Sequence, residues 1–174
     1  MDLVGKAQES MGKVEKFFGN LPGIKGYRQK EMRREADKRV RTSLARRLGT
    51  QRRRLTDLQL KLLETGGLEW VDDLDRAVGK AQLLIDRVNK ADYGYAPFFD
   101  LERIKEAELD RLAQFDEAMF ERLPSVIAAV DGAEAAISAK EGIGEALAGV
   151  TDVLVELNEL FGQRDEAVRE LAIG

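Results

Sequence analysis

The sequence predicts an all-α protein, an antiparallel up-down-up-down four-helix bundle with long, coiled-coil-like helices and a short N-terminal amphipathic helix. Two observations support this fold class. Apolar residues recur every three or four positions along most of the 174 residues, and no segment alternates as a strand would. The composition, 34% charged and only 6% aromatic, is also typical of long helices.

Residues 2–18 form the first predicted helix. Its apolar residues fall within an arc of about 100°, with the lysines on the opposite side. Gly19 ends it, and the turn at Leu21-Pro22-Gly23 separates it from the rest of the chain. We therefore divide the chain into an N-terminal helix, residues 1–20, and a helical bundle, residues 21–174.

Four longer helices are predicted in the bundle, at about 27–65, 68–91, 100–130 and 133–171. Gly66-Gly67 is a left-handed stop after the first of them. Asp100 can cap the start of the third, and Asp131-Gly132 separates the third from the fourth. Short connections at 66–67 and 131–132 favour antiparallel neighbours, which is the basis for the bundle topology.

Charge is distributed unevenly along the chain, whose formal net charge is −4. Residues 25–68 carry 14 bases and 5 acids, whereas residues 69–174 carry 11 bases and 24 acids. The predicted topology brings the basic start of the 27–65 helix and the acidic end of the 133–171 helix to the same end. We expect them to match each other, and we expect arginines inside the apolar arc, such as Arg47 and Arg54, to pair with facing carboxylates.

Histidine and cysteine are both absent from the sequence, which excludes disulfides, thiolate zinc sites and nucleophile–base pairs built on either residue. Carboxylates at helical spacing, such as Asp152 and Glu156, are more often solvated surface than metal ligands. No phosphate-binding loop or calcium-binding loop motif occurs. The sequence therefore predicts no enzyme activity, no cofactor and no metal site.

Basic residues in segment 25–54 are the candidates for binding an anion, either nucleic acid or lipid headgroups. They point around the whole helix and lack interleaved aromatic residues, which disfavours nucleic acid. This alternative set is Arg33, Arg34, Arg46, Arg47, Arg52, Arg53 and Arg54.

Apolar residues in two segments are the candidates for binding a protein partner. The face of helix 2–18 could dock on its own bundle, another chain or a membrane, and the loop 93–99 concentrates 4 of the 11 aromatic residues. The set is Leu3, Val4, Ala7, Met11, Val14, Phe17, Phe18, Tyr93, Tyr95, Phe98 and Phe99.

The function expected from these features is that of a non-enzymatic interaction or scaffold protein, self-associating or binding a protein partner. We expect it in the cytoplasm, with the inner face of the membrane as a further location. Peripheral membrane attachment through helix 2–18 and the basic segment is the first alternative, and nucleic-acid binding is the second.

Overall fold

The computed structural model describes the backbone of residues 30–91 and 106–173, and the side chains of residues 36–91 and 110–170. Its elements are α2 (Lys30–Thr65), a 3-10 turn η1 (Leu68–Trp70), α3 (Val71–Lys90), α4 (Glu106–Ala139) and α5 (Ile143–Ile173). The described residues contain no strand, so the all-α prediction is confirmed for this part of the chain. None of these helices is both long enough and apolar enough to cross a membrane.

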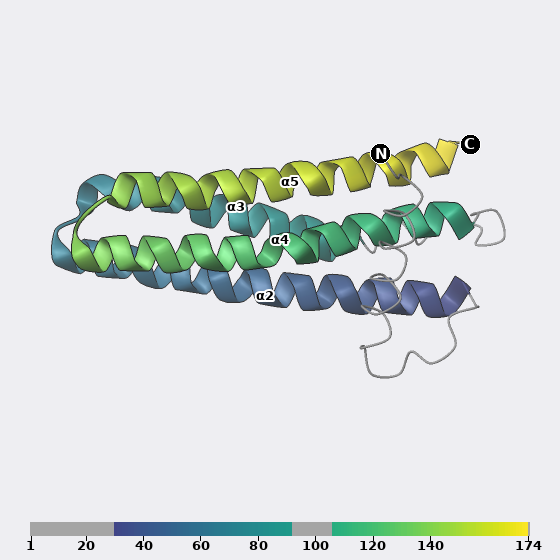
Figure 1. The fold of residues 1–174 in the computed structure, drawn as a ribbon, viewed down its shortest axis with the longest axis horizontal. Coiled ribbons are helices and arrows are strands. Elements are labelled where there is room, and N and C mark those ends of the chain that lie inside the picture. The colour runs from purple at the N-terminus through teal and green to yellow at the C-terminus, as the bar shows by residue number, and fades with distance from the viewer. Residues whose placement is uncertain (1–29, 92–105, 174) are drawn as a thin grey trace, which may run out of the picture.

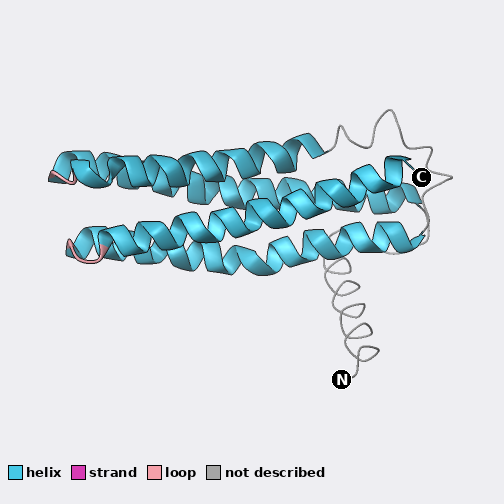
Figure 2. Cartoon of the chain, turned by 90° about the horizontal axis from the view of Figure 1, so that it is seen from above, coloured by secondary structure: helices cyan, strands magenta, loops and turns pink. Residues whose placement is uncertain are grey.

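Figure 1 shows the four helices side by side, and Figure 2 shows both short connections at the same end, which we call the turn end. Helix α2 packs against α3 and α4, and α5 packs against the same two helices. Helices α2 and α5 therefore lie diagonally across the group. Because α3 has 20 residues and the others have 31 to 36, α2, α4 and α5 continue past it as a three-helix section (Figure 1).

Tight turns end α2 and α4 by the same local geometry. Gly66 has φ +83°, and the Gly67 N–H donates to the Leu62 carbonyl at 2.8 Å. After α4, Lys140 takes the same left-handed position with φ 57°, and the Glu141 N–H donates to the Ala136 carbonyl at 3.1 Å. Both patterns close the last helical turn and return the chain onto its own helix.

The break predicted at Asp131-Gly132 is wrong, because α4 continues through both residues to Ala139 and α5 begins only at Ile143. Both residues are exposed, and a side chain at position 132 would meet nothing within 4 Å. The flanking Val130 and Ala133 are fully buried. Apolar burial on both sides outweighs the cost of one helical glycine, about 1 kcal/mol.

Buried residues recur every three or four positions along each helix, and Ala36, Val40 and Ala45 are additional buried positions on α2. The main apolar cluster spans all four helices, and a smaller one, Leu112 and Ala167, lies in the three-helix section. In α4 the buried positions are Leu112, Asp116, Met119, Leu123, Val126, Val130, Ala133 and Ile137. One of these eight positions is an aspartate, and it marks the most unusual part of the interior.

Candidate functional site: a buried ionic layer

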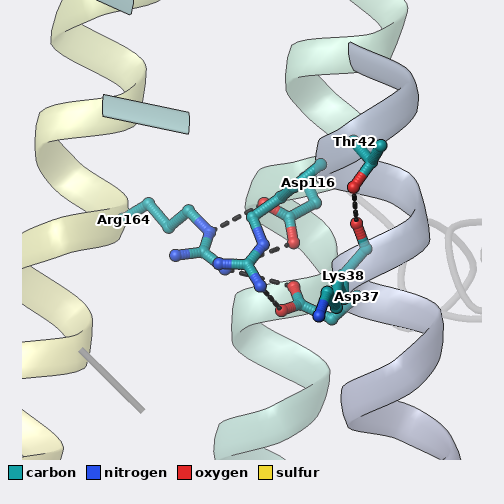
Figure 3. A network of polar contacts seen from close by, with 6 residues as sticks. Asp37, Lys38, Thr42, Asp116 and Arg164 are labelled. Atoms are coloured by element: carbon teal, nitrogen blue, oxygen red, sulfur yellow. Dashed lines mark hydrogen bonds and ion pairs between the residues drawn. The ribbon is translucent and has the colours of Figure 1, made fainter. Parts of the chain in front are cut away.

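Four charged side chains form a layer in the three-helix section, between the two apolar clusters. Helix α2 supplies Asp37 and Arg41, α4 supplies Asp116, and α5 supplies Arg164 (Figure 3). Each occupies a position of the three-four spacing that apolar residues fill elsewhere in its helix. Arg164 is 1% exposed and Asp116 is 2% exposed, which is rare for charged residues unless they are paired.

Arg164 joins the three helices through its guanidinium group. Its Nε donates to Asp116 Oδ1 at 2.7 Å, and its Nη2 donates to Asp37 Oδ1 at 3.1 Å and to Asp116 Oδ2 at 3.5 Å. Arg41 Nη2 lies 2.9 Å from Asp37 Oδ2, one helical turn along α2. One arginine of α5 therefore holds a carboxylate from each of the other two helices.

The two carboxyl groups have pKa values shifted in opposite directions. Burial raises the pKa of Asp116 well above its ordinary value of 3.8, and the Arg164 charge opposes this only in part. Burial also acts to raise the pKa of Asp37, but the hydrogen bond with Asp116 and the charges of Arg164 and Arg41 together lower it. Opposite shifts are what two hydrogen-bonded carboxyl groups show when one of them holds the proton more tightly.

The end of α3 is fixed to α5 beside this layer. The Phe161 ring lies between two guanidinium groups, with the Cζ of Arg87 5.1 Å and that of Arg164 5.7 Å from its centroid. Arg87 also donates to the Asn158 carbonyl at 2.7 Å and pairs with Asp165 at 3.2 Å. These contacts mark the boundary between the four-helix and three-helix sections.

The layer is suited to holding helices in register rather than to chemistry on a substrate. Each acidic oxygen named above already faces a guanidinium group, and the burial of Asp116 and Arg164 leaves a substrate no access to them. Among the described residues, no group of three or more acidic side chains could hold a metal ion. A pocket of about 280 Å³ lies at the turn end, where Leu62, Trp70, Ile137 and Ile143 form part of its lining. The lining also includes the charged residues Glu69 and Lys140.

The predicted anion-binding arginines whose side chains are described have different surroundings. Arg54 pairs with Asp131 at 2.7 Å and with Glu134 at 2.8 Å, and these hydrogen bonds raise its pKa. This is the pairing expected of Arg54 from its place in the apolar arc.

The other predicted arginines have different surroundings. Arg47 lies over the Phe120 ring, with its Cζ 5.9 Å from the ring centroid, rather than against a carboxylate of the described residues, and Arg53 donates to Thr50. Arg46 is exposed and Arg52 is half-buried. Arg33 and Arg34 lie in α2, and their side chains are outside the described residues.

The charge matching predicted between α2 and α5 takes another form. Three of the α5 acids pair with other helices: Glu156 with Arg122, Asp165 with Arg87, and Glu170 with Arg111. Within the described residues, an ion pair that joins α2 and α5 has the reverse sense, since α2 supplies the acid Asp37 and α5 the base Arg164. The side chains of α2 before Ala36 lie outside the described residues.

The apolar candidates for partner binding, in helix 2–18 and loop 93–99, lie outside the described residues. The buried layer was missed because its residues are charged and a charged residue suggests a solvated face. One signal could have found it: the three-four spacing of α4 passes from Leu112 through Asp116 to Met119 without a change of phase. In α5 it likewise passes from Phe161 to Arg164.

No protein-family model, curated protein or solved structure matches this chain. Its function is therefore inferred from its own residues.

Proposed function

We propose that the chain is a non-enzymatic interaction or scaffold protein that acts through protein–protein contacts and self-associates in the cytoplasm. The same proposal includes the finer architecture, an antiparallel up-down-up-down four-helix bundle with coiled-coil-like packing. The recurrence of buried residues every three or four positions and the two tight turns at one end support that architecture.

The observation that carries the proposal is a group of exposed leucines toward the turn end. Leu60 and Leu63 are 56% and 50% exposed on successive turns of α2, and Leu68, just after the turn, is 66% exposed. Single exposed leucines are common on protein surfaces, but apolar residues grouped within nine positions favour a contact surface. A second copy of the chain is the proposed occupant.

Substituting two of these leucines tests the proposal. We expect Leu60→Gln with Leu63→Gln to lower the weight-average mass measured by light scattering over a concentration series. Leu83→Gln is the matched control, since Leu83 is 47% exposed on α3, outside this group. A wild-type chain that stays monomeric at every concentration would contradict the proposal, and so would equal effects of the variant and the control.

Removing residues 1–20 tests the contribution proposed for helix 2–18. We expect a change in oligomeric state while the helicity measured by circular dichroism in the remainder is kept. If instead the truncation abolishes flotation with anionic vesicles and leaves the mass unchanged, the membrane alternative gains and self-association through this helix is excluded.

A further inference from the structure

Two opposite faces of the molecule carry stripes of opposite charge with the same repeat. On α2, Arg39, Arg46 and Arg53 recur every seven residues, and all three are exposed. On α5, Glu145, Asp152, Glu159 and Glu166 recur every seven residues, and all four are exposed. We call these the basic stripe and the acidic stripe.

Each stripe runs along the outermost line of its helix. Arg46 lies two residues from the buried Leu44 and two from the buried Leu48, so it points about 160° away from both. Asp152 has the same relation to the buried Val150 and Leu154. Helices α2 and α5 lie diagonally across the group of four helices (Figure 1). Because each stripe points away from the buried side of its helix, the two stripes face outward on opposite sides of the molecule.

The sequence keeps each stripe free of the opposite charge. Between positions 38 and 56 there is no acidic residue, and between positions 141 and 163 there is no basic residue. Arg46 and Arg53 form no ion pair with a described residue, and the same holds for the four acids of the acidic stripe within the described part of the chain. The charges of these six residues are thus not used within the described fold, unlike those of Arg54 or Glu156.

We propose that the basic stripe of one copy docks on the acidic stripe of a second copy. A seven-residue step on either helix is about 10.5 Å, so successive charges of the two stripes can meet in register. This inference rests on the proposed self-association and adds the two stripes as a contact surface beside the leucine group. The contact joins different faces of the two copies, so it propagates into a chain or closes into a ring instead of stopping at a symmetric dimer.

A second copy fits these faces better than a polyanion does. Nucleic acid or an anionic membrane would use the basic stripe alone, and the net charge of −4 would oppose its approach. A second copy uses both stripes and brings the charges of Arg46 and Arg53 to opposite charges of the acidic stripe. Exposed ion pairs contribute about 0–1 kcal/mol each, so the association is expected to be weak and to fall as salt is raised.

Charge reversal of each stripe, followed by rescue, tests the inference on the full chain. We expect Arg46→Glu with Arg53→Glu, or Asp152→Lys with Glu159→Lys, to weaken self-association about tenfold or more in sedimentation at low salt. Mixing the two double variants should restore association, because the glutamates introduced at positions 46 and 53 of one variant then face the lysines introduced at positions 152 and 159 of the other. Arg76→Glu with Lys80→Glu, on the exposed surface of α3, makes the same change in net charge as the first variant and should leave association near the wild-type value.

The outcomes separate this inference from the proposed function. Association that the charge variants leave intact but Leu60→Gln with Leu63→Gln removes would overturn the stripe contact and keep self-association. Equal weakening by the α3 control would overturn it as a general charge effect. A wild-type chain that is monomeric in all salts overturns both proposals, and retention of that monomer on heparin through Arg46 and Arg53 would assign the basic stripe to a polyanion.

Discussion

The four-helix section and the three-helix section solve the same packing problem with different chemistry. In the four-helix section, α3 completes a group of four helices, and among the described residues no charged side chain is buried there. In the second, three helices meet around Arg164, Asp116 and the α2 pair Asp37 and Arg41. Apolar layers tolerate a shift of one helix along its neighbours by seven residues, whereas after such a shift the charged side chains would face leucines. The ionic layer is therefore expected to set the register that the apolar section stabilises.

Breaking the layer from one side should give the largest effect. We expect Arg164→Met to destabilise the protein by about 3–5 kcal/mol, because two carboxyl groups lose their buried partner. Denaturant unfolding followed by circular dichroism measures this change. Combining Arg164→Met with Asp116→Leu should recover much of the loss, because Asp37 keeps its pair with Arg41 and no carboxyl group of the layer is left without a guanidinium partner. A double variant less stable than Arg164→Met would show that the charges stabilise the fold rather than select its register.

Truncating a side chain in the four-helix section should cost nearly as much by a different mechanism. Leu154 is buried in α5, and Leu154→Ala should destabilise by about 2–5 kcal/mol through lost burial and the remaining cavity. Leu83→Ala, at an exposed leucine, is the control. A loss for Leu154→Ala that disappears in high salt would contradict the apolar character of this section.

Sequence patterns predicted the apolar section well because burial there depends on local spacing. The stop at Gly66-Gly67 and the leucine positions of α2 follow from residues a few positions apart. The ionic layer does not follow from local spacing, because Arg164 and Asp116 are 48 positions apart and become partners only when the helices pack. The same dependence on packing explains why Asp131-Gly132, flanked by the buried Val130 and Ala133, does not end α4.

Adding a methyl group at Gly144, near the turn end, should have a moderate effect on the free energy of unfolding. A Cβ at Gly144 would lie 2.7 Å from the Trp70 ring, so Gly144→Ala should destabilise by about 1–3 kcal/mol through overpacking. Gly149→Ala is the matched control in the same helix, because nothing lies within 4 Å of a Cβ there. It should stabilise by up to about 1 kcal/mol through helix propensity. Equal signs for the two variants in thermal or denaturant unfolding would show that Trp70 moves aside.

A pH dependence confined to the ionic layer is also expected, because burial and the two arginines shift the pKa values of Asp116 and Asp37 in opposite directions. The raised pKa of Asp116 contributes stability that is present below its ordinary value of 3.8 and is lost as pH rises toward its folded pKa. The lowered pKa of Asp37 contributes stability that is present above 3.8 and is lost as pH falls. The layer should thus stabilise the fold most near pH 4.

Relative to wild type, Asp116→Asn should remove the decline in stability above this pH, and Asp37→Asn should remove the decline below it. The loss caused by Leu154→Ala should stay constant across the range, because the side chains around it do not titrate. If both Asp→Asn profiles parallel that of the wild type, neither carboxyl group differs in pKa between the folded and unfolded states.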